Sequence, residues 1–299
     1  MTPILNHIIS FANVPDIDRY LTRYKKAGFS VDPQTVRHAP GRRNGFVHFG
    51  PDYIEFFWVE DQKEFNKKGA ANHKFFQYSP RPFGIALESK NVETFHKNAI
   101  RKGFKLKPTW SKAMREASDS KPWWAFQDIH QKYLPGVWSF MLTYLRRDWT
   151  KPHKVNIGKN TIYGMTGVTF ITSQSPKRAL QWKRFLGGSI EKPARLILGP
   201  HFFEWLTPGE YTRIYGKVRS SMQVKRFTNM QEIALVHLVA KDLQRARAML
   251  NQNKFHLVDR ANGFFIAPDT RDGFAFLVTE MDPAKWMKTR SSYRKVVFE

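Results

Sequence analysis

The 299-residue sequence contains no cysteine. This absence excludes disulfides, thiolate nucleophiles, iron–sulfur clusters and thiolate zinc sites, so histidine, aspartate and glutamate remain as the strong metal ligands. Long apolar runs are lacking too: none approaches the roughly 18 residues of a membrane span, and the N-terminus has no basic region followed by an apolar one. We therefore expect a soluble protein of the reducing cytoplasm, with no membrane partner.

Acidic residues are scarce, with 25 Asp and Glu against 49 Lys and Arg, and the formal net charge is +24. Such a charge attracts anions over a Debye length of roughly 8 Å at physiological salt. The C-terminal stretch AKWMKTRSSYRK, residues 284–295, interleaves basic and aromatic residues as nucleic-acid contacts can. The charges are otherwise scattered, and no helix-turn-helix, zinc-finger or RNA-recognition signature accompanies them. Nucleic acid is therefore the less favoured partner.

Two segments recur at the same interval. FGPDYIEFF, Phe49–Phe57, returns in altered form as LGPHFFEWL, Leu198–Leu206, and Ile85–Leu87 returns as Ile233–Leu235. Both intervals are close to half the chain, and each match is followed or preceded by a similar pattern. Two independent matches with one period indicate a duplicated domain of ordinary size.

The start of the chain predicts a βαβββ unit. Pro3–Phe11 is a β-branched apolar run typical of a buried strand, and Ile17–Gly28 has apolar residues at helical spacing with a glycine at its end. Phe29–Val31 is extended again, and Gly45–Phe49 and Tyr53–Val59 predict two strands joined by a Gly-Pro-Asp turn.

The same order recurs over Phe83–Leu145, Met165–Leu206 and Ile233–Val278. In the second unit we expect the strand after the helix at Phe104–Leu106. The polar, basic stretch Lys151–Asn160 is the predicted linker between the halves. The predicted domains are residues 1–150 and 161–299. The predicted class is α+β with four βαβββ modules.

The motifs LNHIISF, KKAGF, RRNGFVHFG and YIEFFWVED resemble the glyoxalase-like branch of the vicinal oxygen chelate superfamily, which includes glyoxalases, bleomycin resistance proteins and extradiol dioxygenases. The resemblance covers roughly residues 1–150. It implies that the modules pair into two incompletely closed barrels, and that the first barrel has a cavity for a divalent metal, with ligands on the first and last strands of each module.

The resemblance places His7 and Glu55 at metal-ligand positions, with Zn, Mn, Ni or Fe as the candidate ions. If the protein is an enzyme, Glu55 or a nearby carboxylate would move the proton. Strand alternation is consistent with this, because Leu5 and His7 would share one face, and Tyr53 and Glu55 another. The last strand of the second module offers Thr143 where the family often has an acidic residue, so the protein ligands number only two.

The candidate substrate-binding residues are Arg43, Asn44, Tyr53, Phe57 and Thr143. Arg43 and Asn44 could bind an anionic substrate, or they could belong to a solvated loop. His7 could equally be a hydrogen-bonded core residue, and Glu55 could pair with one of the many basic residues.

The second half keeps Glu204 at the position of Glu55, but its first strand, MTGVTFITS, has no histidine, and His237 is out of register. We expect no metal there. The favoured function is a small-molecule pocket in the N-terminal domain, with metal-dependent isomerase or lyase activity on an oxygenated substrate as one form of it. The alternative is a metal-free ligand-binding or drug-sequestering protein, and the sequence leaves a homodimer open.

Overall fold

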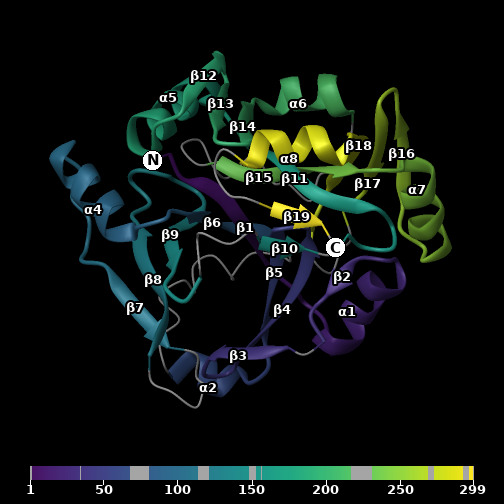
Figure 1. Ribbon diagram of the computed structural model, residues 1–299, viewed down its shortest axis with the longest axis horizontal. Helices are drawn as coiled ribbons and strands as arrows, with labels where there is room; N and C mark the ends of the chain where they lie inside the picture. Colours follow the sequence, from purple (N-terminus) through teal and green to yellow (C-terminus); the bar gives the residue numbers. More distant parts are fainter. Residues whose placement is uncertain are drawn as a thin grey trace.

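The computed structural model describes residues 2–33, 35–67, 81–113, 121–147, 153–155, 157–216, 231–268, 273–291 and 296–298. Two large mixed β-sheets dominate the molecule, and each consists of two βαβββ modules (Figure 1). The predicted α+β class with four modules is therefore confirmed.

The first sheet has the strand order β2-β4-β5-β1-β6-β9-β8-β7, and β3 pairs with β4. Its strands are β1 (Ile4–Phe11), β2 (Ser30–Val31), β3 (Val36–Ala39), β4 (Arg42–Phe49), β5 (Asp52–Val59), β6 (Pro82–Glu88), β7 (Trp110–Ala113), β8 (Pro122–Ile129) and β9 (Trp138–Tyr144). In each module the first strand runs parallel to the last, while β1 and β6 pair antiparallel and join the two modules. The order ends at β2 and β7, so the sheet is not a closed barrel.

The second sheet repeats this topology with the order β12-β13-β14-β11-β15-β18-β17-β16. Its strands are β11 (Ile162–Thr172), β12 (Ser189–Lys192), β13 (Arg195–Leu198), β14 (His201–Leu206), β15 (Gln231–Ala240), β16 (Leu257–Arg260), β17 (Gly263–Ile266) and β18 (Phe276–Glu280). The strands β11 and β15 pair antiparallel, as β1 and β6 do. The two sheets are thus two copies of one arrangement.

The helices that follow the first strand of each module are α1 (Ile17–Lys26), α4 (Val92–Arg101), α5 (Ser175–Leu186) and α7 (Leu243–Gln252). In α1 the Asp16 side chain caps the helix by accepting from the backbone N–H groups of Asp18 and Arg19, at 2.9 and 3.1 Å. Ile17 and Tyr24 lie on the buried face. Each of the four helices thereby covers one module with its apolar side.

Outside the modules lie α2 (Gln62–Lys67), α6 (Pro208–Tyr215), α8 (Pro283–Ser291), β10 (His153–Val155) and β19 (Val296–Phe298). β10 lies in the predicted linker and pairs in parallel with β19, near the end of the chain. Residues 151, 152 and 156 of that linker lie outside the described residues.

One predicted strand is wrong. Residues 104–106 are irregular, and the edge strand of the second module is β7, Trp110–Ala113. Phe104 is buried between the two halves, where its ring lies 4.8 Å from that of Phe185 and 5.1 Å from that of Tyr133. Its apolar character therefore serves packing between the halves. The edge strand β12 had no predicted counterpart, because its mostly exposed side chains show no alternation.

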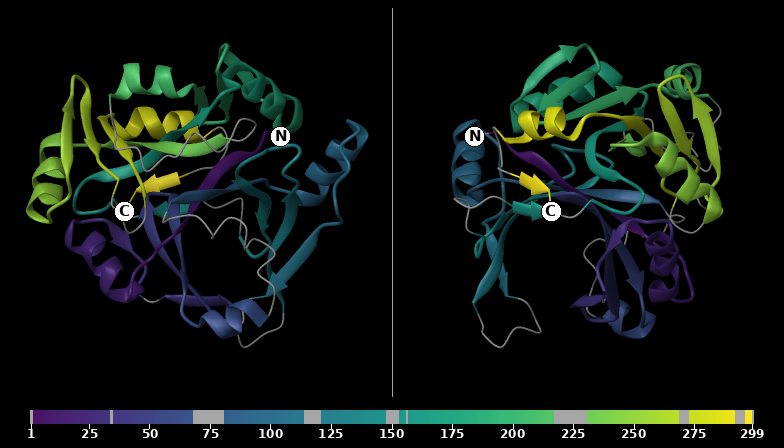
Figure 2. Two further views of the ribbon diagram at one scale, coloured as in Figure 1. Left: turned by 180° about the vertical axis from the view of Figure 1, so that it is seen from behind. Right: turned by 45° about the vertical axis from the view of Figure 1, so that its right-hand side comes forward.

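The two halves share one core. Figure 2 shows the second pair of modules packed on the first, whose sheet curves around a side that faces away from the second pair. The ring of Phe255, in the second half, lies 5.6 Å from that of Tyr24 and 6.4 Å from that of Phe29, and the Arg23 guanidinium lies 4.0 Å from the Phe255 ring centre. Gly28 ends α1 with φ = +84°, and a Cβ there would lie 2.7 Å from the backbone nitrogen of Asn160. This approach favours glycine.

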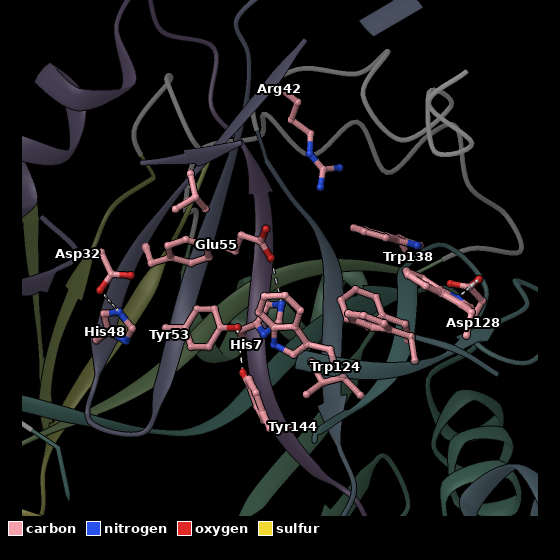
Figure 3. A pocket seen from close by; sticks show the side chains of 16 residues that line it. His7, Asp32, Arg42, His48, Tyr53, Glu55, Trp124, Asp128, Trp138 and Tyr144 are labelled. Carbon is pink, nitrogen blue, oxygen red and sulfur yellow. Dashed lines mark hydrogen bonds and ion pairs between the residues drawn. The ribbon is translucent and has the colours of Figure 1, made fainter. Parts of the chain in front are cut away.

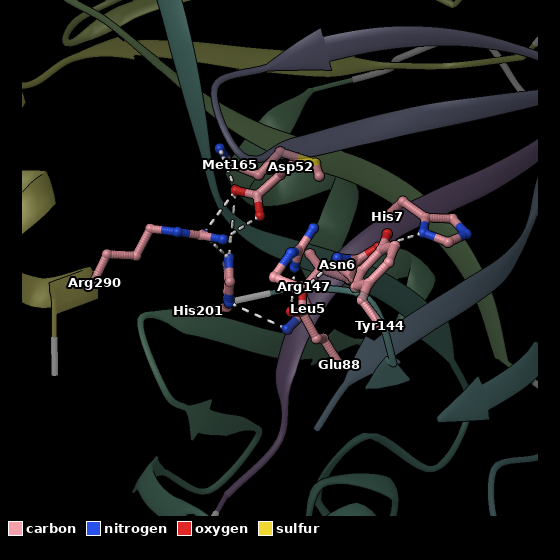
Figure 4. A network of polar contacts seen from close by, with 10 residues as sticks. All are labelled: Leu5, Asn6, His7, Asp52, Glu88, Tyr144, Arg147, Met165, His201 and Arg290. Carbon is pink, nitrogen blue, oxygen red and sulfur yellow. Dashed lines mark hydrogen bonds and ion pairs between the residues drawn. The ribbon is translucent and has the colours of Figure 1, made fainter. Parts of the chain in front are cut away.

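A buried ion pair also links the halves (Figure 4). Asp52, at the start of β5, is fully buried and accepts from both terminal nitrogens of Arg290 on α8, at 2.6 and 2.8 Å. The nearby His201 ring accepts from the Leu5 backbone N–H at 3.3 Å. Arg290 and Trp286 belong to the basic and aromatic stretch 284–295, and both are buried, so these two residues do not form a nucleic-acid surface. Residues 292–295 of the stretch lie outside the described part of the chain.

Burial disfavours the charged form of Asp52, but Arg290 and His201 together hold the pKa of this carboxyl below its ordinary value. A carboxyl whose folded pKa is depressed stabilises the fold above its unfolded pKa. This contribution is lost as the pH falls through the folded pKa. The ion pair should therefore stabilise the folded protein at neutral pH, and this stabilisation should be lost in acid.

Replacing Arg290 with Met should lower the free energy of unfolding by roughly 3 to 5 kcal/mol at neutral pH, because it leaves the buried Asp52 charge without its counter-charge. Chemical denaturation measures the loss. Arg37→Met is the matched control: Arg37 is half exposed in its ion pair with Glu60, and the expected loss is below about 1 kcal/mol. Equal losses in the two variants would contradict the role assigned to Arg290.

Candidate functional site

A cavity of about 370 Å³ lies on the curved side of the first sheet, and both modules line it (Figure 3). We call this cavity the cup. The first module contributes the aromatic side chains of Phe46 and Tyr53. The second module contributes Trp110, Trp124, Phe126, Trp138, Phe140 and Tyr144. Aromatic rings predominate in the cup, and the ionisable side chains of its lining are His7, Asp32, Arg42, His48, Glu55 and Asp128.

Strand alternation positions the polar groups. On β5, Tyr53 and Glu55 line the cup, while Ile54 and Phe56 pack in the main core beneath α1. On β1 the register shifts between Leu5 and His7, so the two residues do not share a face. Leu5 packs in the main core, contrary to the prediction, and His7 lines the cup.

His7 is held in one orientation. Its side chain is 3% exposed, its Nδ1 lies 2.7 Å from Asn6 Oδ1, and its ring stacks on that of Tyr53 with centroids 4.4 Å apart. Asn6 donates from Nδ2 to Glu88 at 2.5 Å, which turns its Oδ1 toward His7 (Figure 4). The imidazole therefore donates from Nδ1 and turns Nε2 toward Glu55.

Nε2 of His7 lies 3.2 Å from Glu55 Oε2 but is not aligned for a hydrogen bond to any of the described residues. Glu55 is held from the other side, because its Oε1 accepts from Asn44 Nδ2 at 2.5 Å. Asn44 Oδ1 in turn accepts from Arg42 Nε at 3.2 Å. Two amides, one behind each group, thus aim an imidazole nitrogen and a carboxylate at the same end of the cup.

Arg42 enters the cup above Glu55 (Figure 3). Its guanidinium carbon lies 4.4 Å from the centre of the Phe57 ring. Burial lowers the pKa of Arg42, and the nearby Glu55 carboxylate offsets part of this effect. Arg42 was not among the predicted site residues.

Of the predicted residues, His7, Tyr53 and Glu55 line the cup. Asn44 lies behind Glu55, and Phe57 lies beneath the Arg42 guanidinium. Both support the cup without belonging to its lining.

Arg43 and Thr143 lie outside the lining. Arg43 donates to Glu60 at 2.8 Å and to Thr35 at 3.2 Å. Thr143 donates to the backbone carbonyl of Ser89 at 2.7 Å. On β9 the residues at even positions, from Trp138 to Tyr144, face the cup, so Thr143 faces the other way.

Sequence reasoning missed Arg42 and the tryptophans of the second module. The signal for Arg42 is the hairpin register: Arg43 pairs with Trp58, which packs against the main core, whereas Arg42 pairs with Val59 on the other face. The period-two aromatic pattern of β9, with Trp138, Phe140 and Tyr144, is the signal for the second module.

The donors present do not make a complete metal site. His7 Nε2 and Glu55 Oε2 are adjacent, but among the described residues no three His, Asp or Glu side chains gather closely enough to hold an ion. Catalytic zinc sites use three protein ligands. The described residues of the cup therefore do not by themselves make a complete site for a metal.

In the second sheet, described side chains fill the position that corresponds to the cup. Glu204 pairs with Thr169 on β11 as Glu55 pairs with Ile9 on β1, but Glu204 Oε1 receives Arg195 at 2.8 Å and Lys192 at 3.3 Å. The α6 residue Tyr215 packs over this face and lies 3.2 Å from Glu204 Oε2. Burial lowers the pKa of His237 to about 3, so its ring is neutral, and it bonds Thr169 at 2.8 Å. The chain itself fills this position.

Two curved sheets of paired βαβββ modules, with a cavity in one of them, define a protein of the vicinal oxygen chelate class. The chain belongs to the glyoxalase-like domain family, whose sequence profile matches residues 5–186. No curated protein matches the sequence significantly. Within the described residues no helix is long and apolar enough to cross a membrane.

Solved structures share the fold at low identity. A hypothetical protein from Staphylococcus aureus has a TM-score of 0.58 and 11% identity, over 92% of this chain and 99% of that one. A mutant of 4-hydroxymandelate synthase from Streptomyces coelicolor has a TM-score of 0.57 and 9% identity, over 94% and 93%. A xylose isomerase-like TIM barrel/4-hydroxyphenylpyruvate dioxygenase fusion protein has a TM-score of 0.55 and 10% identity, over 98% and 52%. These likenesses concern the fold alone.

The two glutamates at matching positions should respond differently to substitution. Glu55→Gln should leave the free energy of unfolding within about 0.5 kcal/mol of wild type, because Asn44 can still donate to the new amide oxygen. Glu204→Gln should cost roughly 1.5 to 3 kcal/mol, because it removes the buried carboxylate that accepts a charge-assisted hydrogen bond from the partly buried Arg195. Urea denaturation of both variants compares them. A large loss at Glu55 would assign it to the architecture of the fold.

Proposed function

We propose that the cup binds a small organic molecule with a flat, aromatic or otherwise apolar body, and that the protein acts as a metal-independent binding protein. The observation that carries this proposal is the aromatic lining around one polar end. A volume of about 370 Å³ lies within the range of roughly 300 to 1,000 Å³ typical of ligand pockets. In this proposal the aromatic rings bury the apolar body of the ligand, and the polar groups set its orientation.

The aromatic walls are suited to stacking. Trp110 and Phe126 already stack on each other, with centroids 4.4 Å apart and planes 21° apart. Trp138 and Phe140 lie 5.0 Å apart further in. A flat ligand can extend such stacks at little cost in side-chain entropy, because these side chains are packed before it arrives.

The polar end is organised in advance. Amide hydrogen bonds hold His7 and Glu55, and Tyr144 donates to Asn6 at 3.2 Å behind them. In this proposal His7, Glu55 and Tyr53 contact the ligand, while Asn44 and Phe57 position the contacting groups. A site whose groups are already oriented loses less free energy to ordering on binding.

A metal-dependent isomerase or lyase acting on an oxygenated substrate is the second candidate. Its support is the position of His7 Nε2 beside the Glu55 carboxylate, with Nδ1 donating to Asn6 as the second nitrogen of many metal-ligating histidines donates to a neighbouring acceptor. Glu55 would then be the residue that moves a proton. Within the described part of the chain no third ligand lies beside these two, which makes this candidate weaker than metal-independent binding.

Nucleic acid binding is the least supported function. Its one favourable feature is a groove between the β8–β9 loop and α5, whose lining includes Lys132, Lys177, Arg178 and Arg184 and no acidic residue. The groove has no stacked aromatic side chains in its lining, and Trp286 and Arg290 point into the core. Both observations distinguish this surface from the aromatic stacking surfaces that bind single-stranded nucleic acid.

Adjacent tryptophans test the binding proposal. Trp124 lines the cup, whereas Trp123, its neighbour on β8, lies outside the lining and packs under Arg146. For any aromatic compound that binds in a small panel, Trp124→Ala should raise the dissociation constant about tenfold, as the loss of a stacked ring implies. Calorimetric titration measures it. Trp123→Ala should change the constant less than about twofold, and equal effects would place binding elsewhere.

Elemental analysis separates the two main candidates. Protein purified without chelators and without a histidine tag should contain less than about a tenth of an equivalent of Zn, Mn, Ni or Fe, since two donors give weak affinity. Adding each ion should not increase the bound amount. Stoichiometric metal that His7→Ala removes would instead establish the metal-dependent candidate.

A further inference from the structure

We propose that the second sheet contains a binding site for a phenol, and that the side chain of Tyr215 occupies this site as a tethered ligand. Tyr215 is the last residue of α6, a helix outside the four modules. Its hydroxyl donates at 3.2 Å to Glu204, the residue that corresponds to Glu55 of the cup. This phenol site is separate from the cup, so its existence does not depend on the proposed function.

Three buried polar residues form one end of the phenol site. Thr169 on β11, Glu204 on β14 and His237 on β15 are 0%, 3% and 7% exposed. Thr169 Oγ1 lies 2.8 Å from His237 Nε2 and 3.4 Å from Glu204 Oε2. Buried polar groups cost free energy unless they are hydrogen-bonded, and a small convergent set of them is typical of ligand sites. This end therefore has the composition of a binding site rather than of an apolar core.

The two carboxylate oxygens of Glu204 have different partners. Oε1 receives Arg195 at 2.8 Å and Lys192 at 3.3 Å, whereas Oε2 accepts from the Tyr215 hydroxyl. Burial alone would raise the pKa of Glu204, but Arg195 and Lys192 hold this pKa below its ordinary value. Burial and the nearby Glu204 carboxylate raise the pKa of Tyr215 to about 12. The carboxylate is thus already charge-balanced, and its second oxygen suits a neutral hydroxyl donor.

Aromatic rings pack against the Tyr215 ring, which belongs to a residue that is 8% exposed. Phe265 on β17 meets this ring edge to face, with centroids 5.7 Å and planes 88° apart. The His237 ring lies 6.1 Å from it, and the ring of Tyr211, one turn earlier on α6, lies 5.2 Å from it. Edge-to-face contacts stabilise beyond the burial of area alone. The phenol is therefore held by its ring and by its hydroxyl, as a bound ligand is.

The α6 helix presents this phenol to the sheet as a well-capped element. Glu210 accepts from the Thr207 backbone N–H at 2.7 Å, and Thr207 Oγ1 accepts from the Glu210 backbone N–H at 3.3 Å, which makes a capping box. The other face of the helix is exposed, and Ile214 on it is 50% exposed. A tethered group has a high effective concentration. Free phenols at low millimolar concentration should therefore not displace Tyr215 in the wild-type protein.

Tyr211 offers a comparison within the same helix. It is 4% exposed and packs in the same hydrophobic cluster as Tyr215, but its hydroxyl has no hydrogen-bond partner among the described residues. Burial of a tyrosine ring beneath α6 therefore does not by itself supply an acceptor for the hydroxyl. The Glu204 carboxylate distinguishes the position of Tyr215 from that of Tyr211.

Vacating and refilling the phenol site tests the proposal. Tyr215→Ala removes the ring, p-cresol is the tyrosine side chain cut at its Cβ atom, and toluene has the same body without the hydroxyl. Calorimetric titration of the full chain should give Tyr215→Ala a site that binds p-cresol at least about tenfold more tightly than toluene, as expected for a buried hydrogen bond to a carboxylate. A cavity without an acceptor would favour toluene, because burying an unpaired hydroxyl costs free energy.

Tyr215→Phe and Tyr211→Ala are the matched controls. Tyr215→Phe keeps a ring in the site, so its p-cresol binding should equal that of wild type, which includes any binding to the cup. Tyr211→Ala should not prefer p-cresol over toluene. If Tyr215→Ala unfolds alone, recovery of its circular dichroism spectrum is compared with each compound at millimolar concentration. An effect of p-cresol no greater than that of toluene, or no effect of either, would overturn the proposal, as would the same preference in Tyr211→Ala.

Discussion

The antiparallel pairing of β1 with β6 is the constraint on which the site depends. Each of these strands is the first of its module and also pairs in parallel with the last strand of that module. The pairing therefore places β5 and β9 on either side of a central β1–β6 pair, within a single sheet. Because the sheet curves, side chains of β5 and β9 converge over the same face. The cup follows from this topology before any ligand is considered.

Two amide side chains hold the polar end of the cup. Asn6 receives the His7 proton and Asn44 donates to Glu55, and each amide is oriented by a charged residue one step further away, Glu88 or Arg42. An amide fixes orientation without neutralising the group it contacts. Glu55 is 12% exposed, and Asn44 holds its carboxylate in place at the end of the cup.

Where polar residues alternate with apolar ones, the sequence predicted both the strand and the side of the sheet on which its polar side chains lie. In YIEFFWV the charge of Glu55 marks the cup face, and His7 marks β1 despite the register shift before it. In WSFMLTY both faces are apolar or weakly polar, so the alignment fell on Thr143, one residue from the cup face. The choice between Arg42 and Arg43 had the same cause, because a one-residue change of register moves a side chain to the other face.

The local sequence could not predict that side chains fill the corresponding position of the second sheet, because this depends on where α6 packs. A comparison of the two repeats nevertheless identifies one residue that accounts for the difference between the two positions. The residue opposite Glu55 on the neighbouring strand is Phe46, and the residue opposite Glu204 is Arg195. Arg195 neutralises Glu204 within the sheet, so that carboxylate has no need of an external partner, and Tyr215 closes over it. Phe46 supplies an apolar wall and no charge. One cross-strand position thus separates Glu204, which pairs with an arginine within its sheet, from Glu55, which lines the cup beside an aromatic ring.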